Sequence, residues 1–300
     1  MLHPLSYVRC GEGVMNRQNA GPEVQTRPRS GRSGAIVLAL AGGVAIFVFG
    51  TPYFELSAAT NDNVVYNGVL TAILGAAAWR LRPRANAYAD VSTALFVAAA
   101  ANWAVVIGPF NWLVTAPTDS PKELFQDKLA QFLAVVPVIL LLAWAVGRSR
   151  RSLYLVRGSP RRWLSIGLPA VLAGAVALVL IARADGVNAT ALAEAAPWLL
   201  CFAAMNSCME ELWFRGVFLQ PYTDHMGAAA AIAVTAIVFG GPHIGATYVE
   251  GATQIPFGLL VMALGVALAW IIRRGSSIWG GVLFHIGMDL AIALEYADVV

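Results

Sequence analysis

The sequence predicts an all-α polytopic membrane protein, a transmembrane helical bundle of about nine spans. Of its 300 residues, 58% are hydrophobic and only 12% are charged, whereas soluble globular domains are about half apolar and about a quarter charged. The apolar residues form runs that approach or exceed the roughly 20 residues a bilayer requires. So few charges cannot cover a soluble surface of this size, and the composition excludes a soluble enzyme, a disordered chain and a nucleic-acid-binding protein.

Each predicted span is a run rich in alanine, valine, leucine, isoleucine and glycine. Residues of these types fill the interfaces between membrane helices or face lipid, so most of each run carries no chemistry. Tryptophans stand near several of the ends, where the bilayer interface favours them. The predicted spans are residues 34–54, 64–79, 88–114, 129–147, 163–182, 191–218, 227–244, 252–272 and 278–296.

The segments that connect these spans are alternately rich and poor in lysine and arginine. The segment before the first span holds five arginines and the connection 148–162 holds six, whereas 55–63 and 245–251 hold none. Cytoplasmic connections carry the excess of basic residues. We therefore expect the N-terminus in the cytoplasm, the C-terminus outside, and a bacterial plasma membrane as the location. The lipid bilayer is the first expected partner.

These patterns predict three parts. Residues 1–33 are a basic tail, rich in glycine and proline and with little to bury, which is typical of disorder. Residues 34–183 are N-terminal transmembrane helices. Residues 190–296 are a transmembrane region that carries the functional candidates described next.

Ionisable residues stand inside three of the later predicted spans. A charged side chain at the centre of a bilayer costs about 2.5–3.5 kcal/mol on insertion scales, so such residues are functional candidates by default. The candidates are Glu210, Glu211 and Arg215 in the sixth span, His243 in the seventh, and His285 and Asp289 in the ninth.

Spacing assigns these residues to faces of their helices. Glu211 and Arg215 are four residues apart, so they share a face and can form an ion pair. Glu210 points about 100° away from that face and is expected to be a free carboxylate. His285 and Asp289 are also four residues apart and share a face.

The residues before His243 predict an irregular backbone. Gly240, Gly241 and Pro242 weaken or end a helix, because glycine has a low helix propensity and proline lacks an N–H. A membrane tolerates irregular backbone only inside protein or beside water. We therefore expect the His243 imidazole to lie at a buried polar site.

A carboxylate with two imidazoles suits the hydrolysis of an acyl bond. A glutamate such as Glu210 can take a proton from water, and a histidine can share that water. A second histidine and a hydrogen-bond donor can stabilise the oxyanion. The same set could instead hold a divalent ion that activates a bound water. The chain has no HExxH motif, the usual zinc-binding spacing.

At these residues the sequence resembles the CPBP family of intramembrane proteases, also called the Abi or CAAX-protease-like family, to which the type II CAAX prenyl endopeptidases are related. Three motifs carry the resemblance: EExxxR, FxxxH and HxxxN/D. They read EELWFR at 210–215, FGGPH at 239–243 and HIGMD at 285–289. The resemblance covers about residues 190–295.

The resemblance implies an intramembrane endopeptidase that hydrolyses a peptide bond with activated water. It implies that Glu210 is the general base and that His243 shares its water. His285 and Asp289 would bind the oxyanion or orient the site. The implied substrate is a peptide or protein, lipidated in the prenyl endopeptidases, and nucleic acid is not an expected partner.

The resemblance also implies roles that the residues alone leave open. Glu211 and Arg215 would be structural or substrate-positioning. The family is described as metalloproteases, which implies a divalent metal such as zinc, held by Glu210, His243 and His285. A glutamate-activated water without metal is the alternative.

The sequence leaves the role of Asp289 open. The third motif ends in Asp289, where the prenyl endopeptidases carry asparagine, and an ionised aspartate cannot donate to an oxyanion. Asp289 is therefore protonated, orients His285, or helps to bind a metal.

Two other functions remain as alternatives to a protease. The protein could be a non-catalytic membrane scaffold or bacteriocin-immunity protein that retains the motifs. It could also be a transporter with a proton relay, although a transporter often shows duplicated halves and we see no internal repeat.

The predicted spans place the candidate residues at different heights. Counted from the cytoplasmic ends, His243 would lie about 25 Å up its span, while Glu210 and His285 would lie about 10–12 Å up theirs. A single site does not tolerate this offset, so a tilted or interfacial segment near 219–230 is expected to remove it.

Overall fold

The computed structural model describes residues 31–51, 60–117, 119–245 and 253–295, and Gly31–Val300 form one compact unit. The described residues form α-, 3₁₀- and π-helices joined by turns, and they contain no strand. The prediction of an all-α protein is confirmed.

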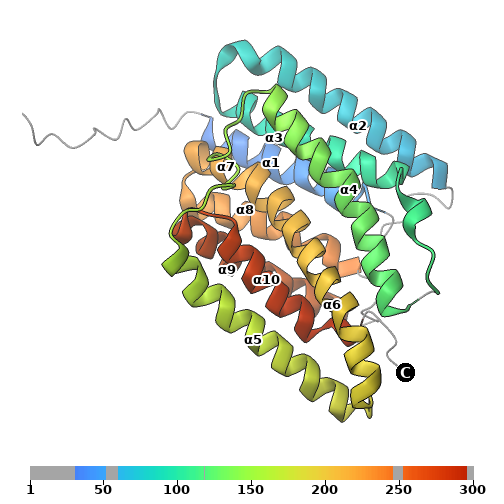
Figure 1. Ribbon diagram of the computed structural model, residues 1–300. Coiled ribbons are helices and arrows are strands. Elements are labelled where there is room, and N and C mark those ends of the chain that lie inside the picture. The colour runs from blue at the N-terminus through green and yellow to red at the C-terminus, as the bar shows by residue number, and fades with distance from the viewer. Residues whose placement is uncertain (1–30, 52–59, 118, 246–252, 296–300) are drawn as a thin grey trace, which may run out of the picture. The chain divides into compact units, whose positions relative to one another are not determined.

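Nine helices occur within the described residues, one for each apolar segment of the sequence (Figure 1). They are α1 (Arg32–Phe47), α2 (Thr60–Leu81), α3 (Ala87–Ile107), α4 (Pro121–Ala145), α5 (Pro160–Ala184), the continuous α6 (Ala189–Glu210) and α7 (Val217–Met226), α8 (Ala228–Gly240), α9 (Gln254–Gly275) and α10 (Trp279–Ala291). Six are long and apolar enough to span a membrane, namely α2 to α5, α6 with α7, and α9. The protein is therefore an integral membrane protein, and nine spans is an approximate number because α1, α8 and α10 are shorter.

Parts of the predicted organisation stay predictions. Residues 1–30 of the expected tail 1–33 lie outside the described residues. The division into N-terminal helices at 34–183 and a functional region at 190–296 describes roles rather than separate folding units.

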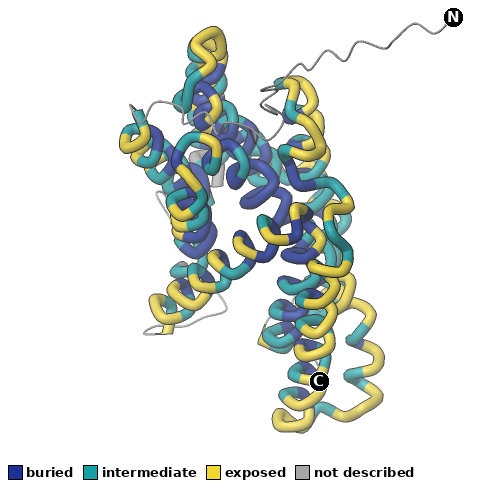
Figure 2. The backbone as a smooth tube through the Cα atoms, turned by 90° about the vertical axis from the view of Figure 1, so that its left-hand side faces the viewer, coloured by how far each residue is buried: buried dark blue, intermediate teal, exposed yellow. Residues whose placement is uncertain are grey.

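The core of the unit lies around α3 and the α6–α7 helix, which carry many of its buried residues. Figure 2 shows the buried segments toward the inside of the helical bundle and exposed segments on its outside. Half of the apolar window of α3 is buried, against only 17% of that of α5. The exposed side of α5 is a stripe of large apolar residues at four-residue spacing, which suits contact with lipid rather than water. The stripe consists of Leu164, Leu168, Leu172, Val176 and Leu180.

The other side of α5 packs closely against α10 through two glycines. A Cβ atom on Gly174 would overlap the carbonyl of Gly287, and a Cβ on Gly287 would overlap the carbonyl of Ala170. Small residues at such positions let the backbones of membrane helices approach each other. This contact fixes the position of α10, which carries two of the candidate residues.

We expect Gly287→Ala to destabilise the protein by about 1–3 kcal/mol, as overpacking does in other cores. The added methyl group meets backbone of α5 and cannot move aside as a flexible side chain could. Thermal unfolding in detergent measures the effect, with Gly275→Ala as the control, because a Cβ there would lie 3.6 Å from Trp163 in ordinary contact. Equal stability of the two variants would show that α5 and α10 are not held at this separation.

Asparagines from other helices donate hydrogen bonds to the backbone carbonyls at the C-terminal end of α1. Asn102 of α3 donates to the carbonyls of Ile46 (3.2 Å) and Gly50 (3.1 Å), and also to Asn67 Oδ1 of α2 at 2.8 Å. Asn67 donates to the Gly50 carbonyl in turn. Helix ends in a membrane need such partners because no water satisfies their carbonyls.

A proline inside α7 has a partner from the connection after α4. Pro221 lacks the N–H that would bind the carbonyl of Val217. Arg148 donates to that carbonyl instead, with Nη1 at 2.6 Å. Burial lowers the pKa of Arg148 to about 10, so the guanidinium is charged at neutral pH. The connection between α4 and α5 thereby supports the helix that continues from the candidate site.

Candidate active site

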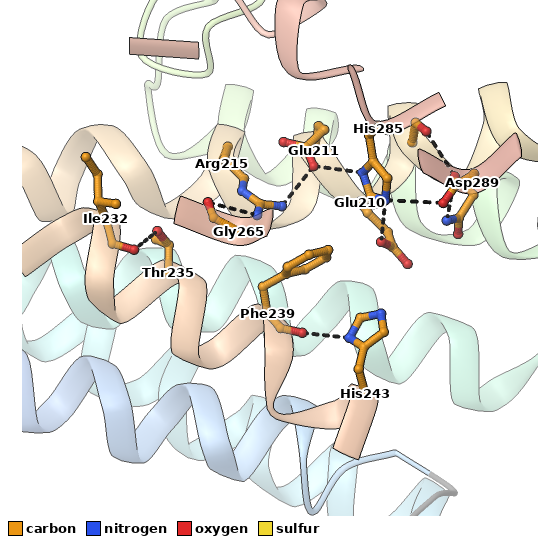
Figure 3. Close-up of polar contacts among 12 residues, drawn as sticks. Glu210, Glu211, Arg215, Ile232, Thr235, Phe239, His243, Gly265, His285 and Asp289 are labelled. Atoms are coloured by element: carbon orange, nitrogen blue, oxygen red, sulfur yellow. Dashed lines mark hydrogen bonds and ion pairs between the residues drawn. The ribbon is translucent and has the colours of Figure 1, made fainter. Parts of the chain in front are cut away.

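Four candidate residues line a single cavity of about 280 Å³. Glu210 lies at the end of α6, His243 in the 3₁₀ turn Pro242–Gly245 after α8, and His285 and Asp289 on α10. Figure 3 shows the Glu210 carboxylate and the His243 ring facing each other, with His285 on the other side of the carboxylate. The expected irregular backbone before His243 is present as this 3₁₀ turn.

The offset in height between His243 and Glu210 that the predicted spans implied is absent, and a longer sixth helix removes it. The sixth span was predicted to end at 218, but its helix continues to Met226 and turns at Gly227 into α8. Glu210 is 16 residues before Met226, and His243 is 16 residues after Gly227. Both therefore lie about 24 Å from the same turn.

The His285 ring lies among three carboxylates. Its Nδ1 is 2.9 Å from Glu211 Oε1, which accepts its hydrogen. Its Nε2 is 3.7 Å from Glu210 Oε2 and 3.5 Å from Asp289 Oδ1. Since Glu211 fixes the Nδ1 side of the ring, Nε2 is the nitrogen that points toward the cavity.

The predicted pair of Glu211 and Arg215 is present, at 2.8 Å with both side chains fully buried. Arg215 also donates to the carbonyl of Gly265 at 3.3 Å. Its guanidinium lies 4.1 Å from the centre of the Phe239 ring, a cation–π distance. The pair thus connects α6, α8 and α9 behind the cavity, and Arg215 reaches His285 only through Glu211.

Asp289 is held by two residues of α6. Its Oδ2 accepts hydrogen bonds from Asn206 Nδ2 (3.1 Å) and Ser207 Oγ (3.0 Å). Because both contacts are donated to Asp289, the carboxyl group acts here as an acceptor. Its other oxygen lies on the His285 side. Of the three roles left open by the sequence, orientation of His285 fits these contacts best.

His243 is oriented by the backbone of α8. Its Nδ1 lies 2.8 Å from the Phe239 carbonyl, so Nδ1 donates and Nε2 is left as the free nitrogen. The Phe239 ring contacts both histidines, with 5.1 Å between its centre and that of His243 and 5.9 Å to that of His285, which it meets edge-on. The FxxxH motif therefore supplies both the hydrogen bond to His243 and an aromatic contact to each imidazole.

The sixth helix changes to a π-helix at Glu211–Gly216, next to the carboxylate in the cavity. Such segments insert one residue into a helical turn and occur often at functional sites. The insertion lets the two adjacent glutamates approach the same ring, Glu211 at 2.9 Å and Glu210 at 3.7 Å. The prediction of separate faces, with a fully free Glu210, was therefore only partly right.

Sequence reasoning missed several residues of the site. Asn206 and Ser207 look like helix-packing residues, although Asn206 precedes Glu210 by one helical turn. Lys128 and Gln131 of α4 and Asn102 of α3 also line the cavity. They lie outside 190–296, so the wall of the site includes helices to which sequence reasoning assigned no function.

Among the described residues, no group of three or more His, Cys, Asp or Glu side chains lies close enough together to hold an ion as the side chains stand. The Nδ1 atoms of His285 and His243 are engaged by Glu211 and by a carbonyl, which leaves the Nε2 atom of each ring available. Histidines that bind a metal through one ring nitrogen usually donate the other N–H in this way. A divalent metal on Glu210, His243 and His285 remains a prediction from the resemblance.

Comparison with known families finds a match for the part of the chain that carries the candidate residues. Residues 191–291 match the model of the type II CAAX prenyl endopeptidase Rce1-like family. The match covers about a third of the 300-residue chain and is a likeness of this region to that family. All six candidate residues lie within it, and the resemblance seen at about 190–295 is confirmed. No curated protein and no solved structure matches the chain. By its description, the matched family is one of CAAX-type proteases.

Proposed function

We propose that the protein is an intramembrane endopeptidase that hydrolyses a peptide bond with water activated by Glu210 and His243. The observation that carries the proposal is the meeting of Glu210, His243 and His285 in one cavity, from three separate elements. The Glu210 side chain is 17% exposed, so it can reach a water there, whereas Glu211 is fully buried.

In the proposed reaction, a water lies between Glu210 and the free Nε2 of His243. The carboxylate takes one proton while the water oxygen bonds to the carbonyl carbon of the substrate. The carbonyl oxygen gains the negative charge and accepts a hydrogen bond from His285, with a proton on Nε2. Glu210 then gives its proton to the leaving nitrogen, the peptide bond breaks, and a carboxylic acid and an amine result.

The remaining motif residues act by positioning. Glu211 holds the Nδ1 side of His285, and Arg215 holds Glu211. Asp289 limits the rotation of the His285 ring from the Nε2 side. A ring fixed on both sides needs little reorganisation when the oxyanion forms, which is the source of such stabilisation.

The proposed substrate is a peptide or protein segment, including a lipidated one, that reaches the cavity from the bilayer or the cytoplasm. The cavity wall is mostly apolar, with Phe47, Phe202, Phe257 and Leu264 among its residues. Such a wall suits a segment that is already in a membrane. The proposed location is a bacterial plasma membrane with the N-terminus in the cytoplasm, as the basic connections indicate.

The test is peptide hydrolysis by the purified protein in liposomes, with products identified by mass spectrometry in ¹⁸O-water. One ¹⁸O atom in the new carboxyl group is the expected result. Activity that survives a chelator supports the route without metal, and activity that is lost and restored by zinc supports a metal. Absence of cleavage across a library of membrane-inserted peptides would favour a scaffold or immunity protein.

We expect Asp289→Asn to retain activity within roughly a factor of ten and Asp289→Leu to lose roughly a hundredfold, as misplacement of a catalytic group by about 1 Å does. Asparagine keeps an oxygen that accepts from Asn206 and Ser207, and leucine keeps neither contact. Initial rates of cleavage measure both variants. A low rate for both would show that the negative charge of Asp289 is itself required.

A further inference from the structure

The cavity contains one lysine, which the proposed reaction does not use. Lys128 of α4 lines the cavity on the side of the N-terminal helices. Histidines aside, it is the sole cation among the described lining residues, which otherwise are apolar, neutral polar or the acids Glu210 and Asp289.

Lys128 has no ion-pair partner in the described part of the chain. No carboxylate there lies within 4.0 Å of its ammonium, and its hydrogen bond is to Gln131 Oε1 at 3.2 Å. The neighbouring Asp127 accepts instead from Gln131 Nε2 at 2.7 Å. Gln131 therefore aligns the ammonium without neutralising it.

Lys128 is half-buried at the wall of a largely apolar cavity, so an anion beside its ammonium is favourable. The α4 helix begins at Pro121, which puts Lys128 about 10 Å along a helix that is long and apolar enough to span a membrane. Ionisable residues within such helices mark binding sites or pathways, and their partner is a group of opposite charge. The ammonium has three N–H donors, and Gln131 takes one of them.

We propose that Lys128 binds a carboxylate of the substrate while the neighbouring scissile bond lies at Glu210 and His243. This assignment rests on the proposed function, because it makes α4 the wall that selects the substrate. The carboxylate is either that of a chain end or that of an acidic side chain near the cleaved bond. Both present the same group to the ammonium.

Three matched peptides distinguish these sources: one with a free C-terminal acid, its C-terminal amide, and the amide with an aspartate near the cleavage site. Binding to the full chain in detergent is followed by tryptophan fluorescence, since Trp213 lines the cavity. Cleavage is followed in parallel, so that binding is tested even if the protein hydrolyses nothing.

We expect Lys128→Met to weaken binding of the carboxylate peptide about tenfold, or about 1.4 kcal/mol, and to leave the plain amide unchanged. In cleavage the change appears in KM more than in kcat. Lys128→Arg should retain the preference because it retains the charge. Lys122→Met is the control, since Lys122 is the only other lysine of the chain and lies exposed on the same helix.

A preference for the free acid that depends on Lys128 identifies a chain-end carboxylate, and a preference for the aspartate peptide identifies a side chain. An equal affinity of wild type and Lys128→Met for every peptide overturns the proposal, as does the absence of binding to wild type. If binding depends on Lys128 but nothing is cleaved, the carboxylate site stands and the peptidase proposal fails.

Discussion

Glu210→Gln should reduce peptide hydrolysis by about 10²–10⁴-fold, the usual contribution of a general base. The amide has nearly the same shape as the carboxylate but cannot take a proton from water. Stability should change little, because Glu210 is partly exposed to the cavity and its nearest charged contact is His285 at 3.7 Å. The measurement is the initial rate of cleavage in liposomes, with thermal unfolding in detergent alongside it.

Glu194→Gln is the matched control for this change. Glu194 lies on the same helix, α6, and is exposed, so its amide variant should have the wild-type rate. If Glu210→Gln hydrolyses peptide as fast as wild type, Glu210 is not the base and another group must activate the water. A biological activity that persists in Glu210→Gln would instead identify the protein as a scaffold.

The largest loss of stability is expected from separating Glu211 and Arg215. Glu211→Gln leaves Arg215 buried and without a carboxylate, and removing one partner of a buried pair typically costs about 3–5 kcal/mol. The loss should be larger than for an exposed carboxylate, because both side chains here are fully buried. Unfolding by heat or denaturant in detergent measures it.

A double variant and a surface variant test whether the unpaired charge of Arg215 causes this loss of stability. Glu211→Gln with Arg215→Met removes both charges, so it should be more stable than Glu211→Gln alone. Asp224→Asn is the control, since Asp224 is exposed and accepts from Gln220 on the same helix, and it should cost less than about 1 kcal/mol. A double variant no more stable than the single one would show that the unpaired charge is not the cause.

The contacts that sequence reasoning predicted correctly are those set by short spacing. Glu211 and Arg215 are four residues apart, and their pairing survives even where the helix becomes a π-helix. Gly240, Gly241 and Pro242 end α8 as expected and place His243 on a 3₁₀ turn. Local rules suffice there because the residues involved belong to one or two turns of chain.

The errors arose where hydropathy was used to find helix ends. The apolar run of the sixth span ends near 218, but Gln220 and Thr223 continue the helix with side-chain contacts of their own. Hydropathy also placed the start of the fourth span at residue 129, which left Lys128 in the preceding connection. The α4 helix in fact begins at Pro121. Ser120 and Glu123 give a capping signal there, and Ser120 Oγ accepts from the Glu123 N–H.

Other features carry no local signal in the sequence. The π-helix at Glu211–Gly216 depends on how α6 packs against its neighbours. The approach of Asn206 and Ser207 to Asp289 joins residues more than 80 positions apart. Such contacts follow from the placement of whole helices and therefore required the structure.

The distance between Glu210 and His243 depends on the number of residues on each side of the turn at Gly227. Two segments of nearly equal length, here called the arms, lead from this turn to the site: residues 210–226 end at Glu210, and residues 228–243 end at His243. A residue inserted into either arm would shift the end of that arm by about 1.5 Å and rotate it by about 100°. The carboxylate and the imidazole would then no longer face each other. Between these two motifs, the chain can therefore change its residue types far more freely than its length, whereas the connection 148–159 lies outside both arms and is free of this constraint.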